Sequence, residues 1–125
     1  MDSIKLIECP RDAMQGIKTF IPTEKKVQYI QSLLRCGFDT IDFGSFVSPK
    51  AIPQMADTAE VLARLDLSAT RSKLLAIVAN TRGAQDAAEH PEIDYLGYPF
   101  SISENFQMRN THKTIAESVI TLQEI

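Results

Sequence analysis

The chain has 125 residues, of which 44% are hydrophobic and 23% are charged, and its formal net charge is −3. This composition is typical of one soluble globular domain and argues against nucleic acid as a partner, because nucleic-acid-binding surfaces are usually basic. No apolar run approaches the roughly 20 residues of a membrane helix, and residues 1–3 do not resemble a signal segment. Cys9 and Cys36 have neither the spacing of a metal site nor that of a disulfide framework. We therefore expect a cytoplasmic protein with no membrane partner.

The first predicted element is a strand over residues 4–9, a short β-branched apolar run that stops at Pro10. This strand should be buried, and the segment 11–22 that follows is interpreted as a loop. Arg11 and Asp12 begin that loop. Because ligands of parallel α/β proteins bind at the carboxyl ends of strands, these two residues are our first candidates for chemistry.

A helix is predicted to begin at Thr23, whose side chain can cap it, and to end before Gly37. A second strand follows over residues 38–43, and the proline-containing residues 44–54 form a long loop at its carboxyl end. Asp57 gives a capping-box-like start to a second helix. The apolar residues expected to face the core from these two helices are Val27, Ile30, Leu34, Val61, Leu62 and Leu65.

The second half of the chain repeats this plan. Residues 74–79 are apolar throughout, which is typical of a parallel strand covered on both faces, and residues 80–83 turn the chain into an alanine-rich helix. Residues 93–100 predict a fourth strand, and residues 101–110 are interpreted as a polar loop. A capping box at residues 114–117 predicts a last helix. The apolar stripe of that helix is Ile115, Val119 and Leu122.

Four βα units joined by short right-handed crossovers predict a parallel sheet, either an open doubly wound sheet or part of a barrel. The segment after the first strand lacks the glycine-rich phosphate turn of open nucleotide-binding sheets. Polar residues follow strand after strand, as they do in barrels. These residues are Arg11, Asp12, Asp42, Ser45, Asn80, Ser103 and Glu104. We therefore predict an α/β fold, a parallel (βα)₄ half of a TIM (β/α)₈ barrel, as one domain over residues 1–125.

The length of the chain adds a further expectation. A complete (β/α)₈ barrel takes about 250 residues, and this chain stops at half that length, inside a predicted helix. We expect the C-terminal half of the barrel to be absent. The first and fourth strands would then have unpaired edges, so we expect a homo-oligomer that forms through these open sheet edges.

Four segments resemble the N-terminal half of hydroxymethylglutaryl-CoA lyase, and they are residues 10–15, 45–57, 80–83 and 103–110. The second segment, which reads SFVSPKAIPQMAD, is the most specific. The arginine–aspartate pair in the first segment is shared with related synthases and aldolases of the same metal-dependent barrel superfamily. The resemblance implies a TIM barrel that binds Mg²⁺ or Mn²⁺, takes an acyl-CoA substrate, and cleaves 3-hydroxy-3-methylglutaryl-CoA into acetoacetate and acetyl-CoA.

The resemblance also implies roles for individual residues. Arg11 falls on the arginine that neutralises the thioester oxygen as it becomes an enolate, Asp12 on the aspartate that binds the metal, and Asp42 where the family usually has a glutamate beside the site. A fixed guanidinium and a hard cation suit this reaction, because the cleavage places negative charge on a carbonyl oxygen. Arg11 and Asp42 are thus the predicted catalytic residues, and Asp12 is the predicted metal ligand. The substrate-binding candidates are Gln15, Ser45, Asn80, Ser103, Glu104, Arg109 and Asn110.

The chain also departs from the family. Cys9 and Ala13 stand where the family usually has glycine, and Asp42 reaches less far than the usual glutamate. Of the family's metal ligands only Asp12 is present, because the His-x-His pair and the asparagine ligand belong to the absent half, and a single carboxylate is a weak Mg²⁺ site. We therefore expect low metal occupancy and little or no lyase activity in the 125-residue chain.

Two alternatives remain open at this point. The first is a non-catalytic half-barrel that self-associates through its open edges. The second is a condensing enzyme of the citramalate- or isopropylmalate-synthase type. Such an enzyme would share the arginine–aspartate pair but is not expected to carry the SFVSPK segment.

Overall fold

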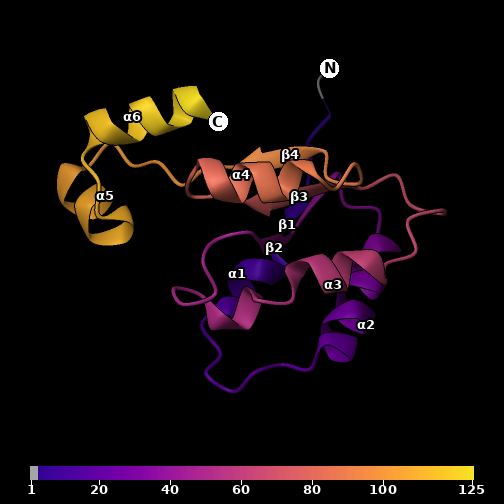
Figure 1. Cartoon of the computed structure of the whole chain (residues 1–125). Coiled ribbons are helices and arrows are strands. Elements are labelled where there is room, and N and C mark those ends of the chain that lie inside the picture. Colours follow the sequence, from indigo (N-terminus) through magenta and orange to yellow (C-terminus); the bar gives the residue numbers. More distant parts are fainter. Residues whose placement is uncertain (1–2) are drawn as a thin grey trace.

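The computed structural model describes residues 3–125 and contains one four-stranded sheet (Figure 1). Its strands are β1 (Ile7–Glu8), β2 (Thr40–Ser45), β3 (Lys73–Ile77) and β4 (Tyr95–Gly97), all parallel and in the spatial order β1-β2-β3-β4. Each strand therefore lies beside the strand that precedes it in the chain, and the predicted (βα)₄ arrangement is confirmed. Within the described residues, no helix combines the length and the apolar character needed to cross a bilayer.

Helical segments connect the strands, and three of them, α1, η1 and α5, lie wholly or mainly where the sequence predicts loops. Pro10 begins α1, where its fixed φ suits the first turn of a helix. Ser103 precedes α5, and its Oγ accepts the backbone N–H of Phe106 at 3.4 Å. The helical segments are α1 (Pro10–Gln15), α2 (Thr23–Leu34), η1 (Pro53–Met55), α3 (Thr58–Ala63), α4 (Thr81–Ala88), α5 (Glu104–Thr111) and α6 (Ile115–Glu124).

The predicted capping box of the last helix is confirmed. Thr114 Oγ1 accepts the backbone N–H of Glu117 at 3.1 Å, and the Glu117 carboxylate accepts the backbone N–H of Thr114 at 2.8 Å. These hydrogen bonds to Thr114 lower the pKa of Glu117 below its usual value. Asp57 directly precedes α3 as predicted, but its side chain makes no capping hydrogen bond and instead accepts from Thr23 Oγ1 at 2.8 Å. The cap predicted at Thr23 is wrong, because Pro22 precedes α2.

The main hydrophobic core lies between the sheet and the helices α2 and α3, which Figure 1 shows together on one side of the strands. The residues predicted to face the core are buried, except that Leu65 is only partly buried. On β3, Leu74 and Ala76 are buried, whereas Leu75 and Ile77 are only partly buried. The prediction that this strand is covered on both faces is therefore wrong, because only one face of the sheet packs on the main core.

The pair α5 and α6 stands to one side of the sheet (Figure 1). Ser118 and Thr121 are the buried residues of α6, whereas Val119 and Leu122 of the predicted stripe are exposed. Gln107 of α5 donates its Nε2 to Ser118 Oγ at 2.6 Å. Neither helix contributes a residue to the hydrophobic clusters found within residues 3–125. The predicted buried stripe is wrong because α6 packs on α5 through polar side chains.

The strands differ from their predicted lengths mainly at the sheet edges. In β1 only Ile7 and Glu8 pair with β2, and the side chains of Ile4, Leu6 and Ile7 are 90%, 64% and 57% exposed. The prediction of a buried first strand is wrong because β1 is an edge strand with one neighbour. β4 is shorter than predicted, and β2 begins and ends two residues later than predicted.

A buried ion pair fixes the connection between α1 and α2. Lys26 is only 2% exposed, and its Nζ lies 2.6 Å from Asp57 Oδ1 and 4.1 Å from the centroid of the Phe20 ring. The same Nζ also donates to the backbone oxygen of Gln54. Gln54 in turn donates its Nε2 to the backbone oxygen of Ile17 at 2.7 Å. These contacts hold the connection against η1 and the start of α3.

Replacing Lys26 with methionine should lower the free energy of unfolding by about 3–5 kcal/mol, because the buried Asp57 carboxylate loses its cation. Urea unfolding followed by circular dichroism measures this loss. Arg64→Met is the matched control, since Arg64 pairs with Glu60 on the surface, where the two side chains are 48% and 54% exposed. The control should lose less than about 1 kcal/mol. Equal losses in the two variants would contradict the role of the buried pair.

Two glycines offer a second matched comparison. Gly37 follows α2 with φ at 81°, and a Cβ added there would meet no atom within 4 Å. Gly37→Ala should therefore destabilise the fold by roughly 1–2 kcal/mol through the left-handed backbone alone. Gly16 is equally open but has φ at −83°, so Gly16→Ala should be neutral or stabilising by up to about 1 kcal/mol. Thermal unfolding of both variants checks the difference, and a loss at Gly16 that matches the loss at Gly37 would refute it.

Candidate functional site

Arg11 is fixed from two sides near the start of α1. Its Nε lies 3.0 Å from each carboxylate oxygen of Asp42 on β2, and its Nη2 donates to Asp42 Oδ2 at 2.8 Å. Its Nη1 donates to Gln15 Oε1 at 2.9 Å. The side chains of Arg11 and Asp42 are 15% and 7% exposed, so this pair is largely shielded from water. The predicted catalytic residues Arg11 and Asp42 are thus brought together, although Arg11 lies in a helix and not in a loop.

The charge of Arg11 is secured by this arrangement. Burial alone would lower the pKa of Arg11, but the hydrogen bonds and the negative charge of Asp42 outweigh burial and raise that pKa above its usual value. The guanidinium therefore stays protonated at any physiological pH and can act only as a donor and a positive charge.

A cavity of about 380 Å³ lies beside this pair, a volume in the range of small-molecule sites. Four of the predicted site residues line it. Arg11 and Gln15 come from α1, Asn80 from the turn between β3 and α4, and Asn110 from α5. The other residues that line the cavity were not among the predicted site residues, and they are Val47, Ala51, Ile52, Ile77, Ala79, Pro99, Thr111, His112 and Lys113.

The unpredicted walls come mainly from two stretches of the chain. Val47, Ala51 and Ile52 belong to the segment after β2, inside the SFVSPKAIPQMAD stretch that carries the family resemblance, but their apolar side chains were given no role of their own. His112 and Lys113 follow α5, and His112 ends that helix with φ at 56°. A prediction of a helix over residues 104–111 would have placed His112 and Lys113 at its C-terminal end. The sequence instead predicts a polar loop in that segment.

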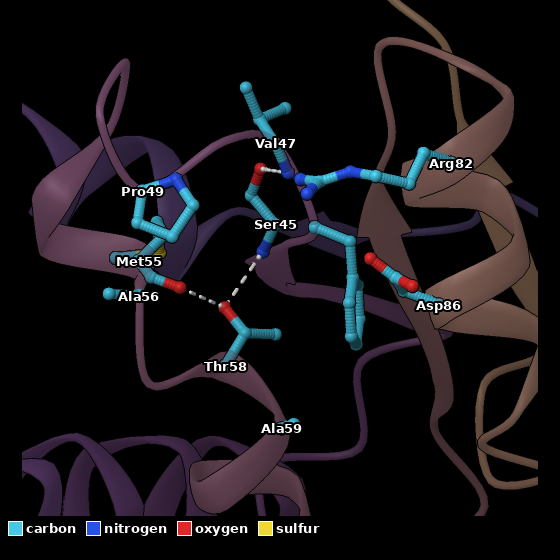
Figure 2. Close-up of a pocket in the computed structure, with 10 residues that line it drawn as sticks. Ser45, Val47, Pro49, Met55, Ala56, Thr58, Ala59, Arg82 and Asp86 are labelled. Carbon is cyan, nitrogen blue, oxygen red and sulfur yellow. Dashed lines mark hydrogen bonds between the residues drawn. The ribbon is translucent and has the colours of Figure 1, made fainter.

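Ser45 lies apart from this cavity. It is buried, and its Oγ accepts the backbone N–H of Val47 at 3.1 Å. Figure 2 shows Ser45 in a second pocket, of about 260 Å³, which Thr58, Arg82 and Asp86 also line. In that pocket the Ser45 backbone N–H donates to Thr58 Oγ1 at 3.1 Å. Ser45 and Arg11 therefore do not face one common space.

Several of the predicted residues serve helix ends or lie on the surface. Asn80 Oδ1 accepts the backbone N–H of Gly83 at 2.8 Å and so caps α4. Ser103 caps α5, and the Glu104 carboxylate accepts the backbone N–H of Ile115 at 3.1 Å. Ser103, Glu104 and Arg109 are exposed and do not line the cavity beside Arg11.

Asp12, the predicted metal ligand, is 72% exposed, and its Oδ1 lies 3.9 Å from Arg11 Nη1. Among residues 3–125 there is no cluster of three or more His, Cys, Asp or Glu side chains that could hold a metal ion. The described residues therefore do not fit a complete divalent-cation site, because such a cation needs several oxygen ligands.

Comparison with known proteins places this site in a family context. No family model matches the chain. It is 34% identical to the mitochondrial hydroxymethylglutaryl-CoA lyase of Arabidopsis thaliana, over 94% of this chain and 25% of that protein. It is 35% identical to the cytoplasmic 3-hydroxy-3-methylglutaryl-CoA lyase of Rattus norvegicus, over 98% of this chain and 35% of that protein. The chain is homologous to part of hydroxymethylglutaryl-CoA lyase.

The solved structure of an HMG-CoA lyase from Acinetobacter baumannii, in complex with coenzyme A and 3-methylmalate, agrees with this homology. It matches 96% of this chain and 39% of its own chain with a TM-score of 0.88 and 34% identity. The resemblance to hydroxymethylglutaryl-CoA lyase and the half of a TIM barrel, both predicted from the sequence, are confirmed. The chain spans 25–41% of the length of the curated hydroxymethylglutaryl-CoA lyases that it matches.

Cys9, which precedes α1, reports on the charges of this site. Partial burial and the negative charge of Asp42 raise the pKa of the Cys9 thiol, Arg11 opposes them, and Asp12 adds a smaller increase. The variant Asp42→Asn should therefore lower the midpoint pH of Cys9 alkylation, measured with iodoacetamide in a Cys36→Ser background. Asp12→Asn should lower it less. A shift at Asp12→Asn as large as that at Asp42→Asn would contradict this description of the site.

Proposed function

We propose that the chain supplies the carbonyl-binding part of a carbon–carbon lyase site for 3-hydroxy-3-methylglutaryl-CoA, whose cleavage gives acetoacetate and acetyl-CoA. The observation that carries the proposal is the guanidinium of Arg11, which Asp42 and Gln15 fix at the wall of a cavity. Homology to hydroxymethylglutaryl-CoA lyases supports the choice of substrate.

Arg11 has donors left for a ligand. A guanidinium carries five N–H groups, and the contacts to Asp42 and Gln15 use the Nε–H, one hydrogen on Nη1 and one on Nη2. Within the described chain, one N–H on each terminal nitrogen is thus left for an oxygen of the ligand. As the carbon–carbon bond breaks, a carbonyl oxygen gains negative charge, and two fixed donors stabilise that charge without having to reorient.

Asp42 acts on Arg11 in this proposal and not on the substrate. Both of its carboxylate oxygens contact the guanidinium, so Asp42 holds the plane and the tilt of that group. Gln15 holds the third nitrogen, which fixes the rotation about the long axis of the side chain. We therefore assign Asp42 and Gln15 as positioning residues, and Arg11 alone as the residue that contacts the reacting oxygen.

The other assignments follow from position at the cavity. The side chain of Asn80 uses its oxygen to cap α4, so its amide N–H groups are the part that it would offer to a ligand. Asn110 would contact the ligand from the opposite wall, on α5. Ser45, Ser103, Glu104 and Arg109 stay predictions of substrate contacts, as the acyl-CoA ligand and the cytoplasmic location do. The relatives carry both cytoplasmic and mitochondrial designations.

A divalent cation, Mg²⁺ or Mn²⁺, would supply a Lewis acid to such a site. Of the described residues only Asp12 is a candidate ligand, and it does not make a site alone. We therefore assign no step to the cation, and we expect no cleavage by the 125-residue chain. Incubation with 3-hydroxy-3-methylglutaryl-CoA and Mg²⁺ or Mn²⁺ should release no acetyl-CoA above the protein-free control. Clear metal-dependent release would show that the site is more complete than proposed.

A chimera tests the lyase assignment itself. The 125 residues replace the matching part of the Bacillus subtilis hydroxymethylglutaryl-CoA lyase, to which they are 34% identical. We expect lyase activity, and the change Arg11→Lys in this chimera should lower kcat by about 10²–10³, because lysine cannot present the same pair of donors. Arg64→Lys, which lies outside the cavity, is the matched control and should leave kcat unchanged. A folded chimera that retains full kcat with Arg11→Lys would overturn the assignment.

A further inference from the structure

We infer that Gln54 is a positioning residue of the candidate site, which holds the backbone of residues 17–21 in place and thereby keeps Gln15 against Arg11. Gln54 belongs to the SFVSPKAIPQMAD segment, the most specific part of the family resemblance, and it does not line the cavity beside Arg11. Its expected effect on catalysis rests on the proposed function, whereas its effect on the backbone can be measured without a substrate.

The side-chain amide of Gln54 bonds to the backbone of a single segment. Its Oε1 accepts the N–H of Ile21 at 2.8 Å, and its Nε2 donates to the backbone oxygens of Ile17 and Thr19 at 2.7 and 3.0 Å. We call these three hydrogen bonds the Gln54 clamp. Both hydrogens of the amide nitrogen are used in it, and Gln54 is only 4% exposed, so water does not readily replace these bonds.

Residues 17–21 have little else that fixes their backbone. They lie between α1 and α2 and belong to no helix or strand. Among residues 3–125, the only other hydrogen bond of this backbone runs from the N–H of Ile17 to the oxygen of Met14, at 3.0 Å. The Gln54 clamp therefore does for these residues what a neighbouring strand does in a sheet, because it bonds to the backbone at positions 17, 19 and 21.

Gln54 is itself anchored on the side away from residues 17–21. The buried Lys26 donates its Nζ to the backbone oxygen of Gln54, and the next residue, Met55, is buried in the main hydrophobic core. The clamp thus joins an irregular segment to the part of the molecule that packs most tightly.

The clamped segment begins directly beyond the site. Gln15 is the last residue of α1, two positions before Ile17, and its Oε1 accepts the Arg11 Nη1–H at 2.9 Å. A helix of six residues is not stable alone, so release of residues 17–21 would let the last turn of α1 open. Arg11 would then keep its contact with Asp42 but lose the contact with Gln15. Its charge would remain, and its unused N–H groups would no longer be held in one direction.

Hydrogen exchange followed by mass spectrometry tests the clamp on the 125-residue chain. Gln54→Met keeps the length of the side chain and removes the amide, so the backbone amides of residues 11–21 should exchange about 10-fold faster, with those of β2 and β3 unchanged. Gln31→Met is the matched control, because the Gln31 amide also bonds to a backbone, at the oxygen and the N–H of Asp66, and does not line the cavity. Unchanged exchange over residues 11–21 in folded Gln54→Met overturns the inference.

The kinetics of the lyase chimera test the effect on Arg11. Gln54→Met and Gln15→Met should each lower kcat by about 10-fold and change KM less, because both leave Arg11 charged but less firmly oriented. The double variant should lie within about twofold of the less active single variant, since both changes act through the same contact. Gln31→Met should retain the kcat of the parent chimera. Losses that multiply in the double variant would mean that Gln54 acts by another route and overturn the inference.

The two measurements separate this inference from the proposed function. A folded parent chimera without lyase activity contradicts the proposed function, and hydrogen exchange then decides on the clamp alone. If Gln54→Met does not fold, native-state exchange of the unchanged chain decides. The amide of Ile21, which bonds to Gln54, and the amide of Ala13 in α1, which bonds to the backbone oxygen of Cys9 at 3.2 Å, should open with the same free energy. Opening at Ile21 while Ala13 stays protected overturns the inference.

Discussion

The contact between Arg11 and Asp42 is the interaction on which the candidate site depends. It joins a six-residue helix that could not be stable alone to the middle strand β2, across 31 positions of sequence. This contact holds the start of α1 against β2 and places the wall that Arg11 and Gln15 give to the cavity. The parallel pairing of Ile7 with Thr40 brings the two residues within reach, so the geometry of the candidate site depends on the register of the sheet.

Residues 3–125 contain two shielded ion pairs, and their surroundings give them different roles. Lys26 has its donors directed at Asp57, at a backbone oxygen and at the face of Phe20, so that pair can only hold the fold together. Arg11 carries a larger donor set than Asp42 and Gln15 consume. Both side chains are shielded and positively charged, so these two properties do not distinguish them. The unused N–H donors of Arg11 are what allow it to bind a ligand, whereas Lys26 can only stabilise the protein.

The apolar stripe of α2 and the capping box of α6 could be predicted from the sequence, whereas very short helices and long-range features could not. The stripe Val27, Ile30, Leu34 and the capping box at Thr114 are local patterns, and both are found in the structure. The six residues of α1 are too few to show a helical period, and α5 has no apolar face. The candidate catalytic pair came from a family resemblance. That Asp42 binds Arg11, instead of facing a ligand, depends on strand register, which no local pattern encodes.

The separate packing of α5 and α6 means that the cavity is built from parts of unequal local stability. One wall belongs to α1 and the ends of β2 and β3, next to the main core, whereas the other belongs to residues 110–113, which are joined to α6 through buried polar contacts such as Gln107 with Ser118. Segments with little buried apolar surface open with a low free-energy cost. A ligand that contacts both walls would therefore also hold α5 and α6 against the sheet, and part of its binding free energy would be used for this.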